Sequence, residues 1–190
     1  AQYSTISGGG PSDPSVNPTT TNNFVTDDYG TIGGGGGNQA GNDGGAVDDA
    51  PYATVGGGLG NEASGGVSTV GGGESNTASE YYATVGGGYS NTASNYYATV
   101  GGGYNNTADG DSATVGGGFD NEASSISATV AGGSGNTASG NRSTVGGGYN
   151  NTASGYASFA AGSQANASHD YSFVWGGDWV GGGSAAARAF

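Results

Sequence analysis

The sequence predicts an all-β repeat solenoid, and its repeats carry the evidence for this fold class. Seven consecutive segments align without gaps at a spacing of 15 residues, each close to the pattern [A/S]-T-V-G-G-G-x-x-N-x-A-S. They begin at Ala53, Ser68, Ala83, Ala98, Ala113, Ala128 and Ser143. A fixed short period is typical of stacked units that contact only their neighbours. The glycine triplets exclude a helix, because each Gly costs about 1 kcal/mol in a helix interior.

Each repeat predicts two short strands joined by the glycine turn. In Tyr82–Val85 the residues are β-prone, and the side chains of Ala83 and Val85 are expected on one face with Thr84 on the other. Asn91–Ser94 is the expected second strand. Because neighbouring strands lie about 4.8 Å apart, equivalent residues of successive turns should form columns along the stack.

Three columns follow from the alignment. The inward core column is predicted to comprise Val55, Val70, Val85, Val100, Val115, Val130 and Val145, and to continue through Phe159 and Val174. A second apolar column comprises Ala63, Ala78, Ala93, Ala108, Ala123, Ala138 and Ala153, continued by Ala167. Stacked asparagine amides hydrogen-bond along a β stack. A structural role is therefore predicted for Asn61, Asn76, Asn91, Asn106, Asn121, Asn136 and Asn151.

The chain divides into three regions. Residues 1–51 hold irregular repeats, Ser4–Gly10 and Gly30–Gly37, with polar insertions from Pro11 and from Ala40 that are expected to leave the stack on one side. Residues 52–155 hold the regular repeats. Residues 156–190 hold degenerate capping repeats and a tail, and the first of these repeats is expected from Ala157, one residue earlier than the regular period would place it.

Composition and charge exclude several functions. Gly accounts for 45 of 190 residues, and only 33% of residues are hydrophobic, so one chain is expected to bury little core and partner chains are the expected remedy. The net charge is −13, from 15 acidic residues against two arginines. Nucleic-acid binding needs a basic footprint, which this chain lacks, and no apolar stretch is long enough for membrane insertion.

Little material for catalysis is present, so no enzyme activity and no catalytic residue is predicted. The chain has one His, His169, and neither Cys nor Lys. No cofactor is predicted. Calcium stays open at the acidic pairs Asp27–Asp28 and Asp48–Asp49 and at Asp109–Asp111, although none of these fits an EF-hand loop.

Aromatic residues recur at two places in the repeat. Tyr89, Tyr104, Phe119 and Tyr149 follow the glycine triplet and are candidate surface contacts for a sugar or a partner protein. Others precede the first strand, namely Tyr52, Tyr82, Tyr97, Tyr156 and Tyr171. The structural alternative is that these rings stack as ladders or fill grooves between chains.

The units STVGGGESNTAS from Ser68, ATVGGGYSNTAS from Ala83 and STVGGGYNNTASG from Ser143 resemble the head repeats of trimeric autotransporter adhesins (YadA-like heads). Similar repeats occur in secreted bacterial and phage fibre-like proteins. The resemblance implies a left-handed parallel β-roll in a homotrimer, with three chains sharing one core. The long period and the full glycine triplet depart from the family, which often has a shorter repeat with fewer glycines.

Two functions follow as expectations. The first is a secreted or cell-surface structural and adhesive protein, a trimeric β-roll head or fibre that stacks head to tail into a filament. The alternative is a receptor- or glycan-binding head from a longer bacterial adhesin or a phage tail fibre, with a host protein or glycan as partner. A one-wide row of outward threonines, Thr54 to Thr144, leaves ice binding as a third alternative.

Overall fold

The computed structural model describes residues 1–9, 22–42, 44, 48–177 and 188–189. Within this part of the chain the regular elements are all β-strands, and all pair in parallel except for the last pairing. The predicted all-β repeat solenoid is therefore confirmed. Predictions that fall on residues 10–21, on Trp179 and on most of the tail lie outside the described residues.

Two sheets run the length of the molecule. The first has 12 strands in the order β1-β3-β5-β7-β9-β11-β13-β15-β17-β19-β21-β22. Their bounds are β1 Thr5–Ile6, β3 Thr31–Ile32, β5 Thr54–Val55, β7 Thr69–Val70, β9 Thr84–Val85, β11 Thr99–Val100, β13 Thr114–Val115, β15 Thr129–Val130, β17 Thr144–Tyr149, β19 Phe159–Ser163, β21 Phe173–Gly176 and β22 Arg188–Ala189.

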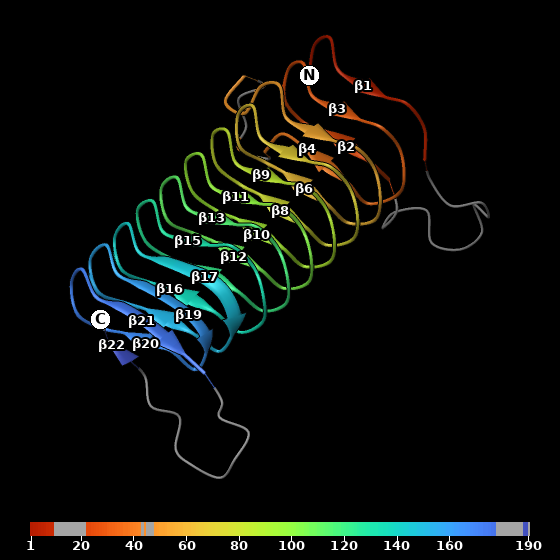
Figure 1. Ribbon diagram of the computed structural model, residues 1–190. Helices are drawn as coiled ribbons and strands as arrows, with labels where there is room; N and C mark the ends of the chain where they lie inside the picture. Colours follow the sequence, from red (N-terminus) through yellow and green to blue (C-terminus); the bar gives the residue numbers. More distant parts are fainter. Residues whose placement is uncertain (10–21, 43, 45–47, 178–187, 190) are drawn as a thin grey trace.

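The second sheet has 10 strands, and it takes the even-numbered elements from β2 to β20. Their bounds are β2 Phe24–Val25, β4 Gln39–Ala40, β6 Glu62–Ala63, β8 Thr77–Ala78, β10 Thr92–Ala93, β12 Thr107–Ala108, β14 Glu122–Ala123, β16 Thr137–Ala138, β18 Thr152–Ala153 and β20 Asn166–Ala167. The chain thus passes from one sheet to the other twice per turn, and the turns stack into a rod with the chain ends at opposite ends (Figure 1).

The rod has two edges, which we name by their sequence. At the glycine edge, the triplet leads from a strand of the first sheet to a strand of the second, as in Gly56–Gly58. At the return edge, the chain crosses back to the first sheet, as in Ser64–Ser68. Backbone hydrogen bonds join successive turns at both edges as well as in the sheets, for example from Leu59 N to Gly73 O at 2.9 Å and from Val67 N to Pro51 O at 2.8 Å.

A narrow core lies between the sheets of the single chain. In each regular turn the first sheet buries an Ala or Ser and the valine, and the second buries the asparagine and the alanine, all at 0–1% exposure. In each regular turn the threonine between the buried Ala or Ser and the buried valine faces outward and is half-buried. Because Val and Ala side chains from the two sheets fill the interior, one chain buries both apolar columns. The core is therefore not shared between chains, and the expectation that partner chains stabilise the fold stays a prediction.

The asparagine column ties the turns together along the axis. In a typical member, Asn91, the side-chain Nδ2 donates to Asn76 Oδ1 at 3.0 Å and also reaches Gly87 O and Gly103 O at 3.0 and 2.8 Å. Its backbone N also donates to Asn76 Oδ1, at 2.9 Å. The same set repeats in each regular turn, and Asn38 and Asn23 extend it toward the N-terminal end. A buried amide is thereby satisfied at both of its polar atoms.

The third glycine of each triplet makes room for this column. Gly103 has φ of 96°, and a Cβ placed there would lie 2.2 Å from Gly118 O and 2.7 Å from Asn106 Nδ2. A side chain would therefore strain the backbone and displace the amide that bonds the neighbouring carbonyls. The asparagine amide needs the space that glycine leaves at this position. This explains why the two residues repeat together.

The core column does not continue through Phe159. Register pairs Val145 with Ala160 and Thr144 with Phe159, so Phe159 faces outward, where its ring stacks on Phe173 at 4.8 Å. Val174 does continue the column, opposite Ala160. The spacing of 15 residues is kept at Phe159 and Ala160, and it shortens to 14 inside β19, where Gly148 pairs with Gly162. A phenyl ring has no space in an interior that Val and Ala fill, so the smaller neighbour takes the inward position.

The insertions also differ from the prediction. Phe24–Val25, which the sequence places inside the first insertion, forms β2 and pairs with β4, while Asn23 begins the asparagine column. In the sequence the first insertion falls between β1 and β2, and the second falls between β4 and β5. Residues 10–21, 43 and 45–47 of these insertions lie outside the described residues, so the expectation that the insertions leave the stack on one side stays a prediction.

The two ends of the rod are not equivalent. At the N-terminal end β1 and β2 are the outermost strands of their sheets, and Ile6 and Phe24 are about half exposed. At the C-terminal end β20 is the outermost strand of the second sheet, but in the first sheet β22 covers β21 in antiparallel pairing, Val174 to Ala189 and Trp175 to Arg188.

The asparagine column predicts a large difference between neighbouring residues. Asn151→Asp should lower the free energy of unfolding by about 3 kcal/mol or more, because it removes a buried donor to Gly147 O and Gly162 O and sets a carboxylate beside them. Asn150→Asp makes the same chemical change at an exposed position and should cost less than about 1 kcal/mol. Chemical denaturation of both variants measures the difference. Equal losses would contradict the structural role of the column.

Candidate functional site

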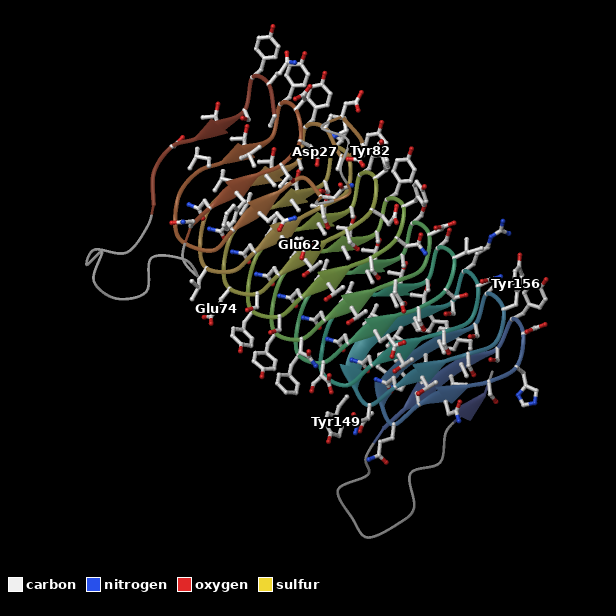
Figure 2. All side chains as sticks on the ribbon, turned by 180° about the vertical axis from the view of Figure 1, so that it is seen from behind. Asp27, Glu62, Glu74, Tyr82, Tyr149 and Tyr156 are labelled. Carbon is white, nitrogen blue, oxygen red and sulfur yellow. The ribbon has the colours of Figure 1, made fainter. Side chains whose placement is uncertain are left out.

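The aromatic residues that follow the glycine triplet form a continuous column on the glycine edge. Parallel bridges join Leu59, Glu74, Tyr89, Tyr104, Phe119, Ser134 and Tyr149 in sequence order. Their backbone hydrogen bonds hold the column in register, and the four aromatic side chains are 41–53% exposed. Figure 2 shows Glu74 and Tyr149 on this edge, opposite Asp27, Tyr82 and Tyr156. The structure thus places all four predicted contact residues on one side of the rod.

Ring stacking covers half of the aromatic ring faces in this column. Tyr89 and Tyr104 stack with centroids 5.2 Å apart at 11°, and Tyr104 and Phe119 stack at 5.1 Å and 10°. Both faces of the Tyr104 ring are therefore covered, and the surface presents ring edges. Tyr149 differs, because its neighbours in the column are Ser134 and Ser163. A ligand that stacks on an aromatic face has access at Tyr149 but not at Tyr104.

A second aromatic column runs along the return edge. Tyr52, Tyr82 and Tyr97 each occupy the position before the buried Ala and have φ of 58–63°. The rings of Tyr82 and Tyr97 stack with their centroids 4.9 Å apart. Tyr171 continues this column at the C-terminal end. Tyr156 does not belong to it, because the residue before Ser158 is Ala157. Tyr156 lies instead in the neighbouring column, where Arg142 Nη1 donates to its hydroxyl at 2.7 Å. The rings of the return edge thus stack as ladders at their left-handed backbone positions.

A polar groove lies beside the aromatic column of the glycine edge. It is lined by Asn105, Thr107, Asp120, Asn121, Glu122, Gly135, Thr137 and Asn150. Asn105 Nδ2 donates to Asp120 Oδ1 at 2.8 Å across adjacent turns. With carboxylates, amides and hydroxyls but no basic group in its lining, the groove suits a neutral polyhydroxyl or a cationic ligand. Asn150 adjoins Tyr149, so the groove and the uncovered ring are neighbours.

His169 is exposed near the C-terminal end. Its Nδ1 lies 3.3 Å from Ser168 Oγ, and the carboxylate of Asp170 accepts a hydrogen bond from Tyr156 N at 2.8 Å. The adjacent carboxylate is thus bound to the backbone of another turn, and a nucleophile–base–acid arrangement needs that group on the imidazole. Catalysis at this histidine gains no support from the geometry.

The fold brings together two of the acidic pairs that the sequence kept open for calcium. Asp27, at 0% exposure, and Asp49, which is exposed, meet at the return edge beside Asn42. Partial desolvation and the neighbouring Asp27 carboxylate raise the pKa of Asp49 above its ordinary value. Asp109 and Asp111 are exposed in a regular turn. No cluster of three or more His, Cys, Asp or Glu side chains suited to a metal occurs among the described residues.

Comparison with known proteins gives no relative from which to transfer a function. No family model matches the chain, and no curated protein matches it either. The described residues contain no helix with the length and apolar character needed to cross a membrane.

The stacked column predicts which tyrosine is structural. Tyr104→Ser removes two ring stacks and should lower the free energy of unfolding by roughly 1–2 kcal/mol, while Tyr149→Ser, which removes no ring stack within its column, should cost less than about 0.5 kcal/mol. Urea denaturation of the two variants compares them directly. A larger loss at Tyr149 would show that this ring packs against the chain rather than facing outward.

Proposed function

We propose that this protein is an extracellular structural and adhesive β-solenoid that assembles end to end into a fibre. The observation that carries the proposal is the N-terminal end of the rod, where no other described strand pairs with the outer edge of β1 or β2 and where Ile6 and Phe24 are half exposed. Unpaired edges are templates for another chain, and natural monomers usually protect them with charge or proline. The described strands at this end carry the apolar side chains of Ile6 and Phe24.

The proposed contact joins the N-terminal end of one copy to the C-terminal end of the next. Ile6 begins the inward column that Ile32 and Val55 continue, so an added turn beneath it would bury its side chain. At the receiving end no other described strand pairs with the outer edge of β20, and the described residues of β22 pair with β21 at two positions. Stacking of β1 on β21 in place of β22 would extend both sheets in parallel. Repetition of this head-to-tail contact yields an open filament.

The resemblance to YadA-like heads adds the left-handed sense of the roll and a homotrimer to this proposal. Since each chain buries its own valine and alanine columns, three chains would contact one another through outward surfaces. The exposed aromatic columns of the two edges are the apolar material available for such contacts. The native mass decides between one chain of 18.0 kDa and a particle of three times that mass.

A charge at the N-terminal end should prevent assembly. In wild-type protein we expect filaments by negative-stain microscopy and a mass that rises with concentration in light scattering. Ile6→Asp should abolish both, because the end contact would bury an unpaired carboxylate. Thr84→Asp makes the same charge change on the outer face of an interior turn and should leave assembly intact.

Two results would contradict the end-to-end proposal. One is wild-type protein that stays a discrete particle at every concentration, whether a monomer of 18.0 kDa or a trimer. The other is equal loss of filaments in Ile6→Asp and Thr84→Asp, which would mean that charge in general, and not the end contact, controls association.

A second candidate function is glycan binding, and the uncovered ring of Tyr149 beside the polar groove favours it. Carbohydrate recognition combines an aromatic face with hydroxyl, amide and carboxylate partners, and Asn150 and Asp120 supply such partners next to Tyr149 and Phe119. The acidic lining disfavours sialylated or sulfated sugars, because their charge would be repelled. A neutral glycan is therefore the proposed class.

A glycan array of neutral and acidic sugars tests this second function. Binding of a neutral glycan should fall about tenfold or more in Tyr149→Ser, which removes the accessible face, and should persist in Tyr104→Ser, whose ring faces are covered by their neighbours. An array without neutral binders would remove the glycan-binding function. Equal loss in both variants would contradict the assignment of the site to Tyr149.

A further inference from the structure

At the return edge near the N-terminal end, one oxygen of a buried carboxylate has no hydrogen-bond partner among the described residues. Asp27 is fully buried, and its Oδ2 accepts a hydrogen bond from Asn42 N at 2.6 Å. Its Oδ1 is also buried and has no hydrogen-bond partner among the described residues. A buried carboxylate oxygen without a partner is costly, so a ligand that donates or carries positive charge would be favoured there.

Protein cations do not supply the missing charge. The chain has no Lys, and its two arginines are Arg142 and Arg188. Arg142 donates to Tyr156 several turns away, and Arg188 lies in β22 at the opposite end of the rod. A second carboxylate, that of Asp49, lies close enough to interact with Asp27. Two carboxylates in contact repel each other unless a proton or a cation lies between them.

Two further oxygens lie close together near this carboxylate. A Cβ built on Gly44 would lie 2.7 Å from Asn42 Oδ1 and 2.9 Å from Asp49 Oδ2, so both oxygens approach the same glycine, which leaves no room for a side chain. Asn42 Oδ1 is oriented by a hydrogen bond from Gly44 N at 2.7 Å. Asp49 is anchored from the regular repeats, since Tyr81 Oη donates to its carbonyl at 3.1 Å.

We propose that Asp27, Asp49 and Asn42 form a Ca²⁺ site at the return edge. Carboxylate and amide oxygens are the ligands that Ca²⁺ prefers, and water completes its six to eight ligands. The ion bonds Asp27 Oδ1 and a carboxylate oxygen of Asp49, and it thereby links the turn after β2 to the chain that leads into β5. Bound calcium would fix the second insertion on the stack. This inference does not depend on the proposed fibre or glycan function.

Terbium luminescence followed by Ca²⁺ competition tests the site in the full chain. After treatment with EGTA, Tb³⁺ should give tyrosine-sensitised emission, because Tyr81 contacts Asp49, and CaCl₂ should displace it. The expected Kd for Ca²⁺ is about 10⁻⁴–10⁻³ M, the range of extracellular modules. Calcium should also raise the melting temperature of the wild-type protein.

Four variants separate the site from general charge effects. Asp27→Asn and Asp49→Asn should each weaken Ca²⁺ binding by about tenfold or more, because each removes a charged ligand. Asn42→Asp adds one and should tighten binding, a gain that misfolding cannot produce. Asp111→Asn removes an exposed acid from a regular turn and should leave binding unchanged.

The proposal fails if Ca²⁺ does not bind saturably to well-folded wild-type protein, as would happen if Asp27 and Asp49 share a proton instead. It also fails if Asp111→Asn weakens binding as much as Asp49→Asn does, since that would mean diffuse attraction by the acidic chain. Circular dichroism establishes that each variant is folded. If Asp27→Asn does not fold, Asp49→Asn and Asn42→Asp still decide the matter.

Discussion

A single buried column of asparagine amides sets the register of the whole rod. Each amide Nδ2 reaches the oxygen of the preceding asparagine and two glycine carbonyls, one from its own turn and one from the next. A shift of one residue in any turn would orphan these groups and also turn the core valines outward. The regular turns therefore share one length, and the glycines that give the amide its space recur with the asparagine.

This constraint accounts for the low hydrophobic content of the chain. Because hydrogen bonds along the axis hold successive turns together, Val and Ala are enough to fill the narrow interior. A larger side chain has to face outward, as Phe159 does by stacking on Phe173. The surface consequently collects the aromatic residues of the protein, and its contacts with other molecules must be made by these outward columns or by the ends of the rod.

Sequence periodicity predicted what is identical between turns and failed where turns differ. The valine, alanine and asparagine columns follow from the regular alignment because each position repeats in space as it does in sequence. Phe159 and Tyr156 were misplaced by one residue, because the spacing shortens inside β19, after Ala160, and only the strand pairing locates this change. Asn23, Asn38 and β2 were not predicted, since the insertions interrupt the spacing around them. The contact of Asp27 with Asp49 joins the turn after β2 to the residues before β5, a pairing across an insertion that the periodicity does not specify.

In a stack of equal turns, specific recognition has to arise where the regular repeat along the axis is interrupted. In an unbroken column every ring covers its neighbour, so Tyr104 presents only an edge, whereas the serine on either side of Tyr149 leaves its faces open. The same logic applies to the buried carboxylate of Asp27, which has no counterpart in the regular turns because it lies beside an insertion. It applies to Ile6 as well, which begins the inward column in β1, the outermost described strand of its sheet, and is 47% exposed. The interior repeats thus supply a rigid spacing. The groups that lack a partner among the described residues lie where this regular repeat is interrupted.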